Sequence, residues 1–153
     1  MEDDTGLEIS AKSIVHKIAV VARAGLNFSV NKLKKLKLGS GQHNILLVLM
    51  DKDGVTQNHL CQRLLLDKGG VARNIYKLEQ KGFVYRKKDV QDPRNNLVYL
   101  TEKAKEMRGD LMEVASSWVK ELTQGFSSTD YLQLNDLLER LESKARSAIN
   151  SND

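Results

Sequence analysis

The chain has 153 residues, of which 41% are hydrophobic and 29% charged, and its formal net charge at pH 7 is +4. This length suits one core and is too short for two ordinary domains, so we expect a single domain over residues 1–153. The longest apolar run, residues 45–50, is far shorter than the ~18 residues of a membrane span, which argues against a membrane protein.

A long amphipathic helix is predicted first, over residues 9–36. Its apolar residues recur at the three- and four-residue spacing of one helical face. A short helix over residues 42–50 is apolar on most sides, which indicates burial, and it ends in the polar turn of residues 51–54. Thr56 can then cap a third helix that extends to Leu65.

The next segment predicts a fourth helix, from Asp67 to about Lys81. The Asp67 carboxylate can accept from the free amides of the first turn, and Gly82 suits the left-handed position behind the helix. Val71, Ala72, Ile75 and Leu78 fall on one side, whereas Arg73 and Lys77 fall on the other. Two short helices in which the second carries basic residues outward are typical of a helix-turn-helix.

A β-hairpin is expected next, from residues 83–85 and 97–100, because both segments are rich in aromatic and β-branched residues. The loop between them holds Pro93, the only proline, which restricts the loop tip. Asp92 and Arg94 are two apart, so in an extended segment their side chains can meet. Our hypothesis is that Asp92 orders Arg94 for a DNA minor groove; the alternative is a plain surface ion pair.

Two further helices complete the prediction. One is capped by Thr101 and continues past Trp118 to about residue 126, and the other is capped by Ser127 with Asp130 in a capping-box position. Along the last helix, Leu134, Leu138, Leu141 and Ala145 recur at four, three and four residues, which indicates a seam that needs a partner helix.

The positive charge is concentrated in the middle of the chain. Residues 55–105 carry eleven Lys and Arg against five Asp and Glu, whereas residues 106–153 carry five against nine. A basic centre suits an anionic partner, of which nucleic acid is the commonest, although a solvated charged face has the same composition.

At this point the chain resembles the MarR-type winged helix-turn-helix transcriptional regulators. The residues that carry the resemblance are Thr56-Gln57-Asn58-His59-Leu60, Asp67-Lys68, Lys77-Leu78-Glu79-Gln80-Lys81-Gly82-Phe83-Val84, Asp92-Pro93-Arg94 and Leu97-Val98-Tyr99-Leu100-Thr101-Glu102. The resemblance implies a mainly α fold with a small β-hairpin wing, in which a winged helix-turn-helix region, residues 42–101, is flanked by dimerisation helices, residues 8–36 and 102–150. Family likeness also implies a homodimer that binds double-stranded DNA, most often as a repressor, and often a small-molecule effector.

In such a protein the recognition helix enters the major groove and the wing approaches the minor groove. The expected recognition-helix residues are Lys68, Gly69, Gly70, Arg73, Asn74 and Lys77. The expected wing residues are Arg86, Lys87, Lys88, Asp92 and Arg94. We expect the dimer to use Leu111, Val114, Trp118, Leu122, Leu134 and Leu138.

The glycine pair departs from the family pattern. Where many members carry Ser or Thr early in the recognition helix, this chain has Gly69-Gly70, which lack hydroxyl groups for phosphate or base. Glycines cost helix stability, roughly 1 kcal/mol each against alanine in a helix interior. They also permit a close backbone approach to a phosphate at the helix N-terminus.

No enzyme, cofactor or metal site is expected. His16, His43 and His59 lie far apart without cysteine or carboxylate clusters at ligand spacing, and the chain has neither a phosphate loop nor a nucleophile elbow.

Cys61 is the only cysteine, so no internal disulfide can form, and a reducing cytoplasm is the expected location. A redox sensor needs an exposed thiolate, whereas Cys61 shares its helix with Leu60, which favours a small core residue.

Two other functions remain open from the sequence. One is a winged-helix module whose hairpin docks a protein instead of DNA. The other is a small-molecule-binding dimer that has lost its DNA function, for which the glycine pair at residues 69–70 is the only hint. Salt dependence separates them, because DNA binding weakens steeply as salt rises.

Overall fold

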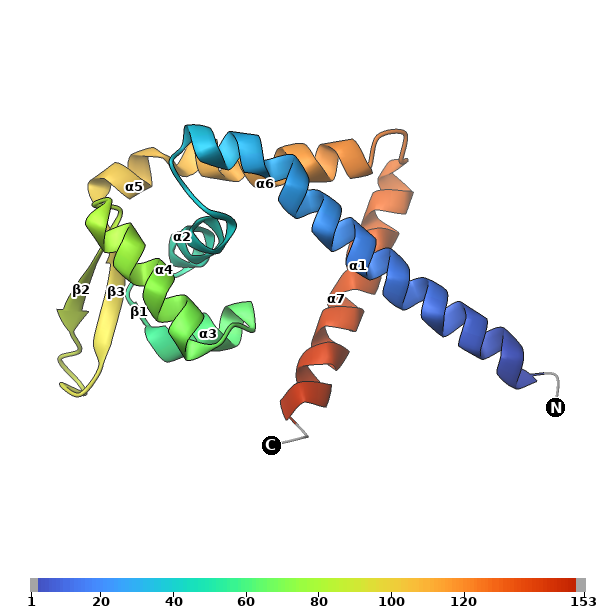
Figure 1. Ribbon diagram of the computed structural model, residues 1–153, viewed down its shortest axis with the longest axis horizontal. Coiled ribbons are helices and arrows are strands. Elements are labelled where there is room, and N and C mark those ends of the chain that lie inside the picture. Colours follow the sequence, from blue (N-terminus) through green and yellow to red (C-terminus); the bar gives the residue numbers. More distant parts are fainter. Residues whose placement is uncertain (1–2, 151–153) are drawn as a thin grey trace. The chain divides into compact units, whose positions relative to one another are not determined.

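Helices make up most of the chain, as the predicted mainly α class requires (Figure 1). The computed structural model describes the backbone of residues 3–150 and the side chains of residues 11–150; the ends of the predicted 1–153 domain, residues 1–2 and 151–153, lie outside the described residues. The elements are α1 (Asp3–Lys35), α2 (Ser40–Asp51), β1 (Val55–Thr56), α3 (Gln57–Leu64), α4 (Lys68–Gln80), β2 (Val84–Lys88), β3 (Asn96–Leu100), α5 (Glu102–Glu106), α6 (Arg108–Leu122) and α7 (Ser128–Asn150).

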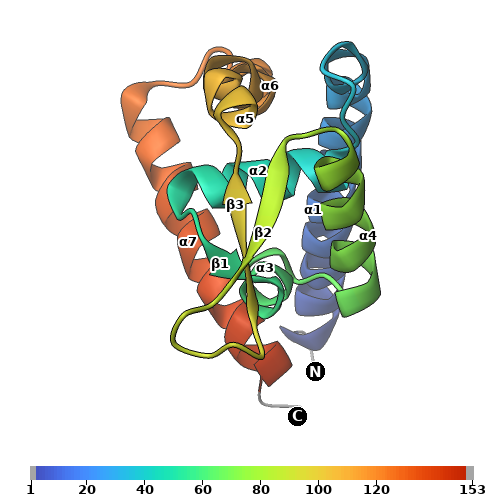
Figure 2. The ribbon, with the colours of Figure 1, turned by 90° about the vertical axis from the view of Figure 1, so that its left-hand side faces the viewer.

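The sheet contains the predicted hairpin and one strand more. β2 and β3 pair antiparallel with Val84 opposite Leu100, and β1 pairs with the other edge of β3, so the order is β1-β3-β2. β1 was missed because two residues are too short to show the alternation of a strand. Figure 2 shows β2 and β3 passing in front of α2, with β1 beside them.

The main core surrounds α2. Ile45, Leu46 and Leu49 of this helix are fully buried, which explains why its sequence is apolar on most sides. Val98 and Leu100 reach the same core from the sheet. The predicted burial of residues 42–50 is therefore confirmed, although the helix begins two residues earlier.

The dimerisation role expected of Leu111 and Val114 is contradicted. Both lie in this core, with 0% and 3% of their surface exposed. The buried ring of His43 lies with Nε2 2.9 Å from the Leu111 carbonyl oxygen, which ties α2 to α6. The spacing of Leu111 and Val114 correctly predicts a buried face, but spacing alone does not say which helix covers that face.

The predicted helix ends are confirmed by their hydrogen bonds. Thr56 accepts from His59 N at 3.1 Å, and Thr101 accepts from Ala104 N at 3.3 Å. Gly82 has φ +71°, the left-handed conformation expected of it. The last cap is a reciprocal box: Ser127 Oγ accepts from Asp130 N at 3.1 Å, and Asp130 Oδ2 accepts from Ser127 N at 2.9 Å.

The helix predicted from Thr101 to about residue 126 is divided in two. α5 ends at Glu106, and the backbone of Met107 has φ −82° and ψ 5°. Its N–H lies within reach of the Ala104 carbonyl at 3.2 Å, a tighter turn than an α-helix makes. Met107 is half-buried against the core, a tertiary contact that local propensity does not reveal.

The chain divides between Trp118 and Val119 into two units. The first holds the sheet, the helices α1 to α5 and most of α6. Inside it, Trp118 lies against Phe28 of α1 with ring centroids 5.2 Å apart. The second unit consists mainly of α7, on which no described residue is buried. None of the helices in the described chain combines the length and apolar character that crossing a membrane requires.

Candidate nucleic-acid interface

Helices α3 and α4 form the predicted helix-turn-helix. Leu65, the C-cap of α3, adopts the left-handed conformation with φ +51°, and α4 begins after a turn of only three residues, 65–67. Gln57 at the start of α3 donates from Nε2 to the Lys68 carbonyl at 3.0 Å. This hydrogen bond holds the first turns of the two helices together.

The two faces of α4 differ as predicted. Val71, Ile75 and Leu78 are fully buried, whereas Arg73 and Lys77 are exposed. The apolar stripe therefore fixes the helix to the core and leaves the basic stripe on the surface. Tyr76, 59% exposed on this helix, was not among the expected site residues.

The glycine pair is explained by the cap of α4. Asp67 Oδ1 accepts from Gly70 N at 2.7 Å, and the carboxylate lies so close that a Cβ on Gly70 would be 2.9 Å from Oδ2. A Cβ on Gly69 would lie 3.3 Å from Nη1 of Arg73. The two positions therefore leave room for the capping carboxylate and for the arginine that folds back over the first turn.

Asn74 differs from the expectation that it is available to DNA. Its Nδ2 donates to the Gly70 carbonyl at 3.0 Å, and a Cβ on Gly41 of α2 would lie only 2.8 Å from the same nitrogen. The side chain is thus part of the contact between α4 and α2. The helical spacing places Asn74 beside Arg73, but it does not reveal the neighbouring helix.

The wing tip is a hydrogen-bonded turn. Asn95 N donates to the Asp92 carbonyl at 2.9 Å, so Pro93 occupies the second position of a four-residue β-turn. The predicted contact of Asp92 with Arg94 is confirmed, at 3.0 Å from Nε to Oδ1 and 3.1 Å from Nη2 to Oδ2. The predicted cause was wrong, because residues 92–94 turn instead of extending.

This ion pair leaves the cation outside. The Arg94 side chain is 90% exposed and the Asp92 side chain 34%, and Asp92 also accepts from Arg94 N at 3.2 Å. The side-chain hydrogen bond from Arg94, followed by the backbone one, holds the pKa of Asp92 below its ordinary value. The carboxylate therefore stays ionised at neutral pH and restrains the guanidinium at the tip.

The three basic residues of β2 do not act as one group. Arg86 forms an ion pair with Glu79 of α4, 3.2 Å from Nη2 to Oε2, so it links the wing to the recognition helix. Side chains alternate along a strand, which places Lys87 on the opposite face of the sheet from Arg86 and Lys88. A run of three cations in the sequence conceals this difference.

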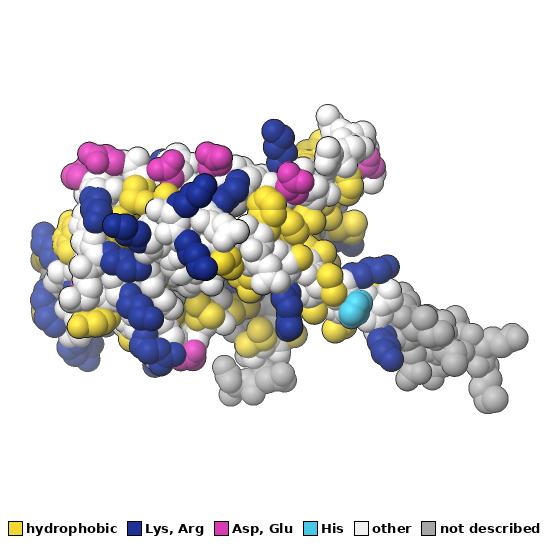
Figure 3. All heavy atoms as spheres, turned by 45° about the horizontal axis from the view of Figure 1, so that its top comes forward, with side chains coloured by type: hydrophobic (Ala, Val, Ile, Leu, Met, Phe, Trp, Pro, Cys, Tyr) yellow, Lys and Arg dark blue, Asp and Glu magenta, His cyan; other side chains and the backbone are white. Residues whose placement is uncertain are grey.

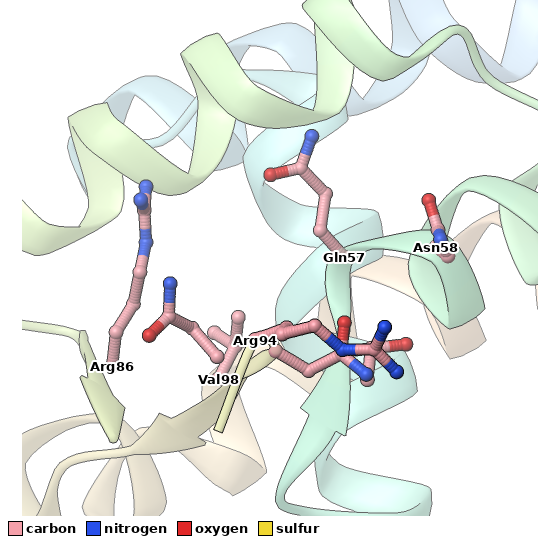
Figure 4. Close-up of a pocket in the computed structure, with 8 residues that line it drawn as sticks. Gln57, Asn58, Arg86, Arg94 and Val98 are labelled. Atoms are coloured by element: carbon pink, nitrogen blue, oxygen red, sulfur yellow. The ribbon is translucent and has the colours of Figure 1, made fainter. Parts of the chain in front are cut away.

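A polar hollow of about 230 Å³ lies between the start of α3 and the wing (Figure 4). Its lining residues are Thr56, Gln57, Asn58, Arg86, Arg94, Asn95, Asn96 and Val98. Sequence reasoning missed Gln57, Asn58 and the two wing asparagines as site residues. Their positions just after a helix cap and beside a loop proline were the available signal.

The wing tip and the N-terminal end of α4 lie at the same end of the winged-helix region, as Figures 1 and 2 both show. Lys and Arg side chains gather over this region in the space-filling view of Figure 3. A recognition helix and a wing that face one way with exposed cations fit the surface of a DNA duplex.

Known proteins share both this sequence pattern and this fold. The MarR family model matches residues 36–94. A MarR transcriptional regulator of Methanosarcina mazei, solved as a crystal structure, is 32% identical; the match covers 90% of this chain and 99% of that one, with a TM-score of 0.85. This chain belongs to the MarR family of transcriptional regulators.

Other MarR-type relatives are similar over comparable lengths. The HTH-type transcriptional regulator YybA of Bacillus subtilis is 29% identical over 84% of this chain and 85% of its own. A MarR-family regulator of Listeria monocytogenes, solved in complex with a 26mer DNA, is 25% identical, covers 88% of this chain and 89% of that one, and has a TM-score of 0.83. The family assignment thus covers nearly the whole chain, beyond the winged helix alone.

Proposed function

We propose that the protein is a sequence-specific, double-stranded DNA-binding transcriptional regulator, which acts as a homodimer on a pseudo-palindromic operator. The observation that carries the proposal is the orientation of α4: its apolar stripe is buried, and Arg73 and Lys77 are exposed on its other side. The N-terminal end of α4 lies at the same end of the winged-helix region as the wing tip. The Listeria relative solved with DNA supports the same partner.

In this proposal α4 lies in the major groove. Arg73 reads a guanine through a two-pronged hydrogen bond, and Lys68 and Lys77 contact phosphates. Arg94 enters the adjacent minor groove, already ordered by Asp92. Arg86 joins the wing to α4 through its ion pair with Glu79. Lys88, on the same face of the wing, contacts a phosphate.

The homodimer is supported by apolar surface that one chain leaves uncovered. On α1, Ile14, Val15 and Ile18 are each at least half exposed, and on α7 so are Leu138 and Leu141. Exposed apolar residues at helical spacing on both terminal helices suit a twofold interface. Two recognition helices would then read half-sites one helical turn apart, ~10 base pairs.

The proposal includes repression and release by a small molecule. A dimer on its operator blocks access of other proteins to the DNA, and a small-molecule effector would release it by binding better to a dimer whose recognition helices are spaced wrongly for the groove. Such an effector must bind the released form of the dimer more tightly than the DNA-binding form.

A salt-titrated binding assay tests the proposal. The probe is the DNA upstream of the protein's own gene, and the competitor is unrelated DNA of equal length. We expect the logarithm of the binding constant to fall linearly with the logarithm of salt concentration, with a steep slope. A shallow slope, or no preference for the upstream DNA, would instead favour the protein-docking module or the small-molecule-binding dimer.

Replacing Arg94 by alanine should weaken operator binding roughly tenfold, because it removes the exposed cation of the wing tip. The effect should be largest on operators with A·T-rich flanks, whose narrow minor grooves attract arginine. Fluorescence anisotropy on matched A·T-rich and G·C-rich flanks measures it. The control is Lys52→Met, which removes an exposed cation from the end of α2 and should leave operator affinity nearly unchanged. Equal affinities for wild type and Arg94→Ala would show that Asp92 and Arg94 form only a surface ion pair.

A further inference from the structure

Lys81, at the C-terminal end of α4, makes side-chain hydrogen bonds to the turn after α1 and to α2. Its Nζ donates to the Lys37 carbonyl oxygen at 2.6 Å and to Gln42 Oε1 at 2.6 Å. Lys37 lies in the turn after α1 and has φ +58°, and Gln42 is a buried residue of the first turn of α2. One ammonium group thus joins the recognition helix to the α1–α2 junction.

The two acceptors differ in burial: the Lys37 carbonyl is exposed, whereas Gln42 is buried. The carbonyl oxygens behind the end of a helix have no partner within that helix, and the negative end of the helix dipole favours a cation there. Gln42 is only 6% exposed, so its side-chain oxygen would be left without a hydrogen bond if the ammonium were removed. The contact is therefore directional, unlike the apolar packing of α4 on the core.

Two neighbouring contacts strengthen the same attachment. Asn74 of α4 lies so close to Gly41 that a Cβ there would come within 2.8 Å of Nδ2. On the other side, Lys103 Nζ of α5 donates to the Lys81 carbonyl oxygen at 2.7 Å. The last turns of α4 are thus held by polar contacts to α2 and α5 and to the turn that follows α1.

We propose that Lys81 is a positioning residue that sets the angle of α4 against α1, and thereby the spacing of the two recognition helices in the dimer. The inference rests on the proposed function, in which α1 belongs to the dimer interface and α4 enters the groove. Apolar packing lets a helix shift by small steps, whereas a buried amide oxygen and a helix-end carbonyl accept from one ammonium position. Lys81 has no part in touching DNA.

The test compares wild type with Lys81→Met, which keeps most of the side-chain length and removes the ammonium. Lys34→Met, an exposed position near the end of α1, is the matched control. Each dimer is titrated with two DNA duplexes, one with the operator spacing preferred by wild type and one with a base pair inserted between the half-sites. Wild type should prefer the first strongly, and Lys81→Met should lower that preference by about threefold or more.

Three outcomes would overturn the proposal. If Lys81 only stabilises the fold, the variant loses affinity for both duplexes alike and the preference stays unchanged. If Lys81 contacts a phosphate, the salt slope falls by about one per protomer. If Lys34→Met lowers the preference equally, any loss of a positive charge near the end of α1 has the same effect, and the hydrogen bonds of Lys81 are not its cause.

A measurement without DNA separates this inference from the proposed function. Should wild type bind no DNA, the proposed function fails, and amide hydrogen exchange on the free protein still tests the attachment. Exchange over residues 37–42 and the last turn of α4 should then be faster in Lys81→Met than in wild type or Lys34→Met. Unchanged exchange in those segments would show that Lys81 does not hold the junction.

Discussion

Replacing Arg73 by methionine should weaken specific binding by about 1–3 kcal/mol for each half-site, because a two-pronged arginine–guanine contact contributes that much to discrimination. Arg73 is exposed on α4, and its guanidinium folds back over Gly69 at the start of the helix. Methionine has similar helix propensity, so the fold should persist. Titrations against the operator and against single-base variants measure both the loss and its position.

Arg73→Lys separates base reading from charge. Lysine keeps the cation but lacks the planar fork, so affinity for unrelated DNA should be retained while preference for the operator falls. If Arg73→Lys behaves as wild type and Arg73→Met loses affinity equally for all sequences, Arg73 contacts phosphate instead of a base. The base contact would then have to be sought at another exposed residue of α4, of which Tyr76 is the first candidate.

The local features of the fold could be predicted because the residues that determine them are adjacent in sequence. Thr56, Asp67 and Thr101 each cap the helix predicted for them. Gly82 is left-handed behind α4 because a residue without a Cβ adopts that conformation at no steric cost. These are interactions over three or four residues, which a single sequence displays directly.

The features that were missed depend on partners distant in sequence. Leu111 and Val114 form an apolar face whose cover is α2 and its neighbours, and the same spacing would suit a dimer interface. Asn74 turns inward because Gly41, more than thirty residues earlier, leaves room for it. The sequence shows that a face is apolar or polar, but the packing of the helices decides what it meets.

The wing illustrates a correct contact with a wrong cause. Asp92 and Arg94 meet because Asp92 begins a β-turn with Pro93 at its second position and also accepts from Arg94 N. Aspartate and proline at these positions are turn formers, and that chemistry was the better signal than strand alternation. The Arg94→Ala substitution tests the hypothesis that this ion pair orders Arg94 for a minor groove.

Replacing Leu138 by glutamate should convert the dimer into monomer and lower affinity for the full operator by about 10²- to 10⁴-fold. Leu138 is 53% exposed on α7, and Leu141, one turn further on, is 52% exposed. In a twofold interface each substitution is present twice, so two carboxylates would enter one apolar contact. Burying these charges without a partner strongly destabilises the dimer. The affinity loss follows because a linked second site adds that much to binding without a new contact.

Ser143→Glu is the matched control, because Ser143 lies on the opposite side of α7 from the leucine seam and is exposed. It adds the same charge to the same helix, so any change it causes reports charge alone. Sedimentation measures the oligomeric state, and titration of a single half-site measures the intrinsic affinity of one protomer. Leu138→Glu should leave half-site affinity near that of wild type. A variant that stays dimeric would remove α7 from the interface and leave α1 to hold the dimer.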